Sequence, residues 1–245
     1  MSVAENITKM VGRKKLHFSL LDPDKQTSKV AGSIAKMAEE AGSSAIMVGG
    51  STLKSHNQVD ETVKAIKSQT NLPVILFPSG AQFLSKYADA VFFMSLLNSR
   101  NLEFVIREHV KGAPFVKKSG IEPIPMGYVI VEPGMTAGRI GEADLIKKDD
   151  IETAVGYALA AEYLGMKFFY LEAGSGASYP VSNEMIRAVK KSISIPLIVG
   201  GGIRNVKTAR EKTRAGADII ITGTTLEEAK NLKQALGDII QAIEE

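Results

Sequence analysis

Short apolar segments recur at regular intervals along the chain. They are rich in Val, Ile and Phe, and they lie at residues 16–21, 45–48, 73–77, 90–97, 124–131, 167–171, 196–199 and 218–222. Continuous apolar runs of this length are typical of parallel strands that are buried on both faces. The sequence therefore predicts eight buried strands.

Helical patterns fill most of the intervals between these strands. From residue 30 to 41, apolar side chains recur at the spacing of one helix face, and the same spacing occurs at 59–69, 151–164, 185–192, 206–215 and 226–243. Gly42, Gly165 and Gly216 each follow such a segment and precede a strand, where a helix C-cap is expected. Alternating strands and helices imply right-handed parallel crossovers. Eight units of about 31 residues favour a single (β/α)8 barrel over residues 1–245, with an open doubly wound sheet as the alternative.

The third crossover is too short for a full helix. Only residues 78–89 separate the third strand from the fourth, and 81–88 offers two helical turns at most. We expect a shortened or replaced third crossover helix. Residues 99–122, which are punctuated by Gly and Pro after Val110, and residues 134–149 are expected to be loop-like. Both follow strands, so both are expected on the rim that carries catalysis in barrels.

Composition excludes several classes of protein. The 30 basic and 27 acidic residues leave a formal charge of +3 without an extended basic stripe, so no nucleic acid is expected as a partner. The absence of Cys excludes disulfides, thiolate nucleophiles and zinc ribbons. The chain has neither an 18-residue apolar run nor the apolar core of a signal peptide. We therefore expect a cytoplasmic protein.

Glycine clusters follow the sixth, seventh and eighth strands. They are Gly174-Ser175-Gly176, Gly200-Gly201-Gly202 and Gly223, which precedes Thr224. In barrels, the last loops commonly bind phosphate through backbone N–H groups, and glycine allows the backbone to approach closely. Each cluster alone is compatible with an ordinary turn. Together, in neighbouring loops, they indicate a phosphate site.

Carboxylates end the first and sixth strands. Asp22 is expected either to bind a metal or to begin a turn before Pro23. Ser51, after the second strand, either caps a helix or adds an oxygen ligand, and with Asp22 it fits the few protein ligands that Mg²⁺ usually takes. Tyr170 and Glu172 share a strand face, so Glu172 is a candidate acceptor for a substrate hydroxyl, with an internal salt bridge as the alternative. The three histidines are far apart in sequence, and we expect structural or exposed roles for them.

Together, residues 21–25, 49–51, 170–176, 200–204 and 223–224 resemble the geranylgeranylglyceryl phosphate synthases of archaea. Bacterial heptaprenylglyceryl phosphate synthases share the pattern. The resemblance implies a barrel with a modified third helix, and a prenyltransferase that joins geranylgeranyl diphosphate to the C3 hydroxyl of sn-glycerol 1-phosphate. This reaction releases diphosphate and makes the first ether bond of archaeal membrane lipids.

The resemblance also implies roles for individual residues. Asp22 and Ser51 match the Mg²⁺ positions. The glycerol phosphate site matches Tyr170, Leu171, Glu172, Ala173, Gly174, Ser175, Gly176, Gly201, Gly202, Gly223 and Thr224. A homo-oligomer is suggested, with a hexamer as one form. Leu20 stands where one branch of the family has Lys, and Ala173 stands where that branch has Tyr, so the chain fits the second archaeal branch.

The residues agree with this chemistry. Mg²⁺ held by Asp22 would stabilise charge on a leaving diphosphate, and Glu172 would orient and deprotonate the alcohol. The fourth strand and the gap at the third crossover are expected to border an apolar groove for the prenyl chain. The Asp-Asp-x-x-Asp motif of chain elongases is absent, because Ile151, Glu152 and Thr153 follow Asp149-Asp150.

Three alternatives stay open: another prenyl length, another phosphate-binding barrel enzyme such as an isomerase or aldolase, and a binding protein without turnover. Because a prenyl substrate is greasy, transient contact with a membrane surface is expected, although the sequence alone indicates no amphipathic anchor.

Overall fold

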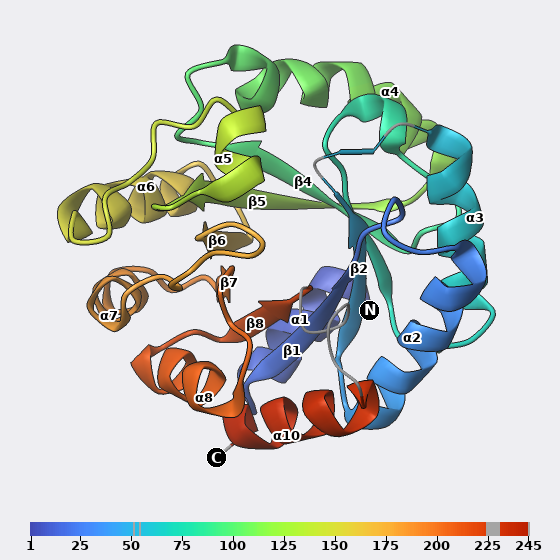
Figure 1. The fold of residues 1–245 in the computed structure, drawn as a ribbon. Helices are drawn as coiled ribbons and strands as arrows, with labels where there is room; N and C mark the ends of the chain where they lie inside the picture. The colour runs from blue at the N-terminus through green and yellow to red at the C-terminus, as the bar shows by residue number, and fades with distance from the viewer. Residues whose placement is uncertain (51, 54, 224–230, 245) are drawn as a thin grey trace.

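Eight parallel strands close into a barrel in chain order in the computed structural model, which describes residues 1–50, 52–53, 55–223 and 231–244 (Figure 1). The strands are β1 (Leu16–Leu21), β2 (Ala45–Gly49), β3 (Val74–Phe77), β4 (Ala90–Leu96), β5 (Glu122–Ile130), β6 (Phe168–Glu172), β7 (Leu197–Gly200) and β8 (Ile219–Thr222). Strand β8 pairs with β1, which completes the ring. The predicted (β/α)8 barrel is confirmed.

Side chains alternate between the barrel interior and the layer beneath the helices. In β1, Leu16 and Phe18 join the interior apolar cluster, whereas Leu21 belongs to the cluster under the helices. His17 is buried on the outward face, and its ring nitrogens each lie 2.9 Å from a hydroxyl, Ser43 Oγ and Thr222 Oγ1. Burial lowers the pKa of His17 to about 3, so its imidazole is neutral and structural at ordinary pH.

Helices surround the barrel in Figure 1. They are α2 (Ser28–Ala41), α3 (His56–Lys67), α4 (Glu108–Ser119), α5 (Met135–Ile140), α6 (Ile151–Tyr163), α7 (Asn183–Ser192), α8 (Val206–Ala215) and α10 (Leu232–Glu244). Helix α2 shows how the sequence sets the boundaries: the Thr27 side chain accepts from the Val30 N–H at its start, and Gly42 ends it at φ +102°. No helix of the described residues is long and apolar enough to cross a membrane.

The third crossover lacks an α-helix, as predicted. Its place is taken by η1 (Ala81–Phe83), a single turn of 3-10 helix. Helix α4, from the next unit, covers the exposed side of this crossover: a Cβ added at Gly112 would lie 3.1 Å from Leu84 Cδ1. Val91 of β4 and Val116 of α4 belong to one apolar cluster. The barrel wall at β3 and β4 is therefore covered by a helix that follows β4.

The prediction that residues 99–122 are loop-like after Val110 was wrong. A π-helical turn, η2 (Glu103–Arg107), leads directly into α4, which continues to Ser119 with Pro114 inside it. Proline removes one hydrogen bond and disfavours a helix interior. The burial of Gly112 and Val116 against the barrel offsets this local preference. Within 134–149, also expected to be a loop, α5 forms a short helix.

A first helix, α1 (Val3–Val11), was not predicted. A capping box between Ser2 and Glu5 starts it, and Ile7 is buried in the interior cluster of the barrel. The backbone N–H groups of Val3 and Ala4 donate to the carboxylate of Glu122, at the start of β5. Helix α1 therefore closes the amino end of the barrel, which leaves the carboxyl end for the functional site.

Candidate functional site

A cavity of about 340 Å3 opens at the carboxyl ends of the strands. Asp22, which follows β1, and Glu172, which ends β6, both line it. The rest of the wall is mostly apolar and includes Leu84, Val91, Phe93, Met94, Leu96 and Phe104. The cavity thus borders β4 and the third crossover, as predicted for the groove. The same cavity is lined by polar residues and by an apolar wall, which suits an amphiphilic ligand.

Glu172 is the buried acid of the site, with only 6% of its surface exposed. The Tyr170 hydroxyl donates to its Oε2, and the Gly174 N–H donates to its Oε1 at 2.7 Å. Burial raises the pKa of Glu172, while these two hydrogen bonds pull it back down. Among the described residues Glu172 has no ion-pair partner, so the salt-bridge alternative is not supported. A carboxylate with a raised pKa beside a cavity suits proton transfer.

The glycine loops after β6 and β7 interlock around this carboxylate. A Cβ added at Gly201, where φ is +81°, would lie 2.5 Å from Glu172 Oε1. One added at Gly200 would lie 2.2 Å from the Tyr170 hydroxyl oxygen. The Arg204 side chain donates to the Gly176 carbonyl at 2.8 Å and ties the two loops together. The predicted adjacency of the clusters is therefore present for β6 and β7.

The other predicted substrate residues differ in how they face this space. Ser175 and Gly223 line the cavity. The side chains of Leu171 and Ala173 instead belong to the apolar cluster beneath the helices, so only their main chains face the site. Gly202 sits at φ +70° in the loop after β7. Thr224 lies outside the described residues. The assignment of all these residues to glycerol phosphate stays a prediction.

Asp22 lines the same cavity and also forms a local turn. Its Oδ1 accepts from the Asp24 N–H at 3.4 Å, and its carbonyl accepts from the Lys25 N–H at 3.1 Å. Helix α2 is capped by Thr27, so Asp22 is not its cap. Burial, followed by the neighbouring Asp24 carboxyl, raises the pKa of Asp22 to about 7. Asp22 therefore both forms the predicted turn and lines the cavity wall.

This carboxylate fits a hard divalent cation. Burial and the neighbouring Asp24 carboxyl disfavour the ionised form of Asp22, and a bound cation would favour it. Ser51, the second predicted ligand, lies outside the described residues. The described part of the chain contains no group of three or more His, Cys, Asp or Glu that could hold a metal. A metal ion bound at Asp22 would thus need water or substrate oxygens as further ligands, as Mg²⁺ in proteins usually does.

Two aromatic residues of the site were missed in the sequence. Phe77 ends β3 and packs edge-to-face on Tyr128, with ring centroids 5.5 Å apart. Tyr128 pairs in register with Tyr170, and their ring centroids are 5.1 Å apart. Both missed rings line the cavity. The sequence signal for Tyr128 was its place in the fifth strand, on the inward face that includes Met126.

His17 and His56 have the structural and exposed roles expected of them, whereas His109 lies at the cavity. His17 is buried, and its ring contacts the hydroxyls of Ser43 and Thr222. His56 is exposed, and its Nε2 lies 3.6 Å from Asp60 Oδ2. His109 lines the apolar part of the cavity and packs edge-to-face against Phe93.

The chain is similar in sequence and in structure to known proteins. The sequence matches the PcrB family over residues 9–243. A geranylgeranylglyceryl phosphate synthase of Picrophilus torridus is 49% identical over 243 residues, 99% of this chain and 100% of that protein. One of Thermococcus kodakarensis is 56% identical over 223 residues, 91% of this chain and 88% of that protein. The crystal structure of (S)-3-O-geranylgeranylglyceryl phosphate synthase from Thermoplasma acidophilum in complex with its substrate sn-glycerol-1-phosphate is 46% identical, with a TM-score of 0.97 and coverage of 100% of this chain and 99% of that one.

Proposed function

Because this chain belongs to the PcrB family, we propose that it transfers a geranylgeranyl group from its diphosphate to the C3 hydroxyl of sn-glycerol 1-phosphate. One observation carries the proposal: a single cavity joins the buried acceptor Glu172 and the glycine loops to an apolar wall. The polar end suits a small phosphorylated alcohol, and the apolar wall suits a prenyl chain. The product is a glyceryl ether phosphate, and diphosphate leaves.

The loops after β6, β7 and β8 are the proposed place for glycerol phosphate. Backbone N–H groups at glycine-rich turns bind phosphate oxygens because no side chain blocks the approach. The relative from Thermoplasma acidophilum was solved with sn-glycerol-1-phosphate, which supports this choice of substrate. Arg204 contributes by tying the loop after β6 to the loop after β7.

Glu172 is the proposed proton acceptor. As the glycerol hydroxyl oxygen bonds to C1 of the prenyl group, the bond from C1 to the diphosphate oxygen breaks and its electron pair leaves with the diphosphate. The hydroxyl proton passes to the Glu172 carboxylate. Tyr170 and the Gly174 N–H hold that carboxylate in place, so the acceptor is oriented before substrate arrives.

Asp22 is the proposed ligand of Mg²⁺, together with Ser51 on the strength of the family resemblance. The ion, when bound, would stabilise negative charge that develops on the diphosphate. Asp22 follows β1, whereas the proposed glycerol site is formed by the loops after β6, β7 and β8, so a diphosphate near Asp22 would leave the glycerol site free for the second substrate.

The experiment that tests the function is direct. The protein is incubated with geranylgeranyl diphosphate, sn-glycerol 1-phosphate and Mg²⁺, and the ether product is measured by mass spectrometry. Parallel incubations use the opposite glycerol phosphate enantiomer and shorter or longer prenyl diphosphates. Lack of product from every combination would refute the proposed function.

Two variants test the residue roles. Glu172→Gln keeps the shape and removes the basic oxygen, so kcat should fall by about 10²–10⁴ while the KM for glycerol phosphate changes little. Glu184→Gln on α7, 69% exposed, is the matched control. Asp22→Asn should abolish the turnover that depends on Mg²⁺, while the circular dichroism spectrum is retained. Full turnover in either site variant would contradict its assigned role.

A further inference from the structure

The outer face of η2 and α4 carries an exposed apolar stripe. Leu102, Ile106 and Val110 are 54%, 52% and 67% exposed, and each follows the last by four residues. At this spacing successive side chains lie one above another along a helix. We call these three residues the apolar stripe. Large aliphatic side chains lined up in water usually mark a surface that meets a partner.

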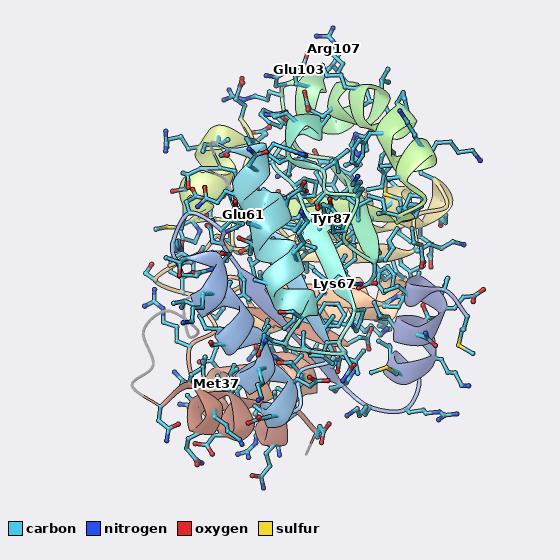
Figure 2. All side chains as sticks on the ribbon, turned by 90° about the vertical axis from the view of Figure 1, so that its right-hand side faces the viewer. Met37, Glu61, Lys67, Tyr87, Glu103 and Arg107 are labelled. Atoms are coloured by element: carbon cyan, nitrogen blue, oxygen red, sulfur yellow. The ribbon has the colours of Figure 1, made fainter. Side chains whose placement is uncertain are left out.

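The same segment has a positive net charge. Residues 100–119 contain Arg100, Arg107, Lys111, Lys117 and Lys118 against Glu103 and Glu108, a net charge of +3. The other 225 residues hold 25 basic and 25 acidic side chains, so their net charge is zero. Figure 2 shows Arg107 and Glu103 at one extremity of the molecule. The apolar stripe therefore lies in a segment of net positive charge. Arg107 and Lys111 pair with Glu103 and Glu108, and the surplus is carried by Arg100, Lys117 and Lys118.

The inner face of this segment forms a wall of the cavity. Phe104, His109 and Gly112 line the cavity, while the apolar stripe on the same helical turns is exposed. One helix thickness, about 10 Å, thus separates the two surfaces. If the proposed function holds, the long-chain substrate partitions into lipid, and this wall is where the protein would meet it.

We propose that the apolar stripe and its basic residues dock on the surface of an anionic lipid bilayer. Aliphatic side chains on one helix face with Lys and Arg beside them suit insertion at the boundary between headgroups and acyl chains. A second copy of this chain fits less well. A two-fold interface would place the +3 segment against itself, and the like charges would repel.

Vesicle binding tests the proposal without any substrate. The wild-type protein is floated with vesicles of phosphatidylglycerol or of phosphatidylcholine, at low salt and at about 0.5 M salt, where surface charges are screened. We expect stronger binding to phosphatidylglycerol, and weaker binding at high salt. A triple variant, L102S with I106S and V110S, should bind phosphatidylglycerol vesicles about tenfold more weakly or worse.

A control and a second measurement keep the outcome clear. Tyr163→Ser with Leu164→Ser removes apolar side chains that are 80% and 72% exposed at the end of α6, and should leave binding unchanged. Hydrogen exchange of the wild-type protein should slow over residues 102–118 when phosphatidylglycerol vesicles are added, which tests the surface even if the triple variant fails to fold. Turnover of detergent-dispersed substrate by the triple variant should match wild type.

Three results would each overturn the proposal. They are equal binding of the wild type to both lipids, triple-variant binding equal to wild type, and a fall in the sedimentation mass of the triple variant, which would make the stripe a contact between copies. Failure of the proposed function would look different, since vesicles would still bind the wild type while no ether product formed.

Discussion

Tyr170→Phe gives the sharpest test of how the site holds its acid. The Tyr170 hydroxyl donates to Glu172 Oε2, while the Gly174 N–H holds the other oxygen. The substitution removes one oxygen atom and leaves the ring that packs against Tyr128. It therefore isolates one hydrogen bond to the carboxylate.

The magnitude follows from the charge of the acceptor. A hydrogen bond to a charged group contributes about 1.5–3 kcal/mol, and 1.36 kcal/mol corresponds to one pKa unit. A bond donated to the carboxylate favours its ionised form, so its loss raises the pKa of Glu172 further, by about 1–2 units. In the wild-type protein, burial raises the pKa of Glu172, and the hydrogen bond from Tyr170 lowers it. The unfolding free energy at neutral pH should also fall, by about 1–3 kcal/mol, because a buried oxygen loses its partner.

The assay is the pH dependence of kcat/KM for glycerol phosphate. The acid limb of the profile, where Glu172 becomes protonated and inactive, should move to higher pH by about 1–2 units. Tyr163→Phe, the same change on an exposed side chain of α6, should leave the profile in place. If the acid limb of a folded, active Tyr170→Phe protein lies at the same pH as that of the wild type, the hydrogen bond from Tyr170 does not lower the pKa of Glu172, and the reasoning is refuted.

Three further predictions concern Asp22, Gly201 and Gly112. The folded-state pKa of Asp22, about 7, exceeds its ordinary value of 3.8, so this group lowers stability as pH rises through that window. Asp22→Asn should therefore raise the urea midpoint at pH 8 and leave it nearly unchanged at pH 4. Gly201→Ala should raise the KM for glycerol phosphate and destabilise the fold by about 1–3 kcal/mol, because the new methyl meets Glu172 at a left-handed backbone position; an unchanged KM would contradict this. Gly112→Phe would fill part of the apolar cavity and should shift product profiles toward shorter prenyl chains, whereas Gly156→Phe on α6, with open space around its Cβ, should not.

The strands were predictable because their sequences are locally consistent. A parallel strand covered on both faces needs an uninterrupted apolar run, and such runs mark each of the eight strands to within about two residues. Strand periodicity also brought Tyr170 and Glu172 together, since the side chains of alternate residues point the same way.

The remaining features depend on contacts that the local sequence does not encode. Helix α4 contains Gly112 and Pro114, which locally oppose a helix, and it forms because its buried face covers the third crossover. The aromatic contact between Phe77 and Tyr128 joins β3 to β5 across the cavity, and only the closed barrel shows it. Helix α1 is short, and its anchoring to Glu122 spans 119 residues of sequence.

The missing third helix links specificity to stability. In an ordinary barrel each helix covers its own crossover, so a wall residue can change without disturbing the next unit. Here α4 both covers the neighbouring crossover at Leu84 and shapes the cavity with Gly112. A mutation that retunes the cavity will therefore also perturb the packing of the barrel. Adaptation to a new chain length should proceed through paired substitutions, one that reshapes the wall and one elsewhere that restores the lost stability.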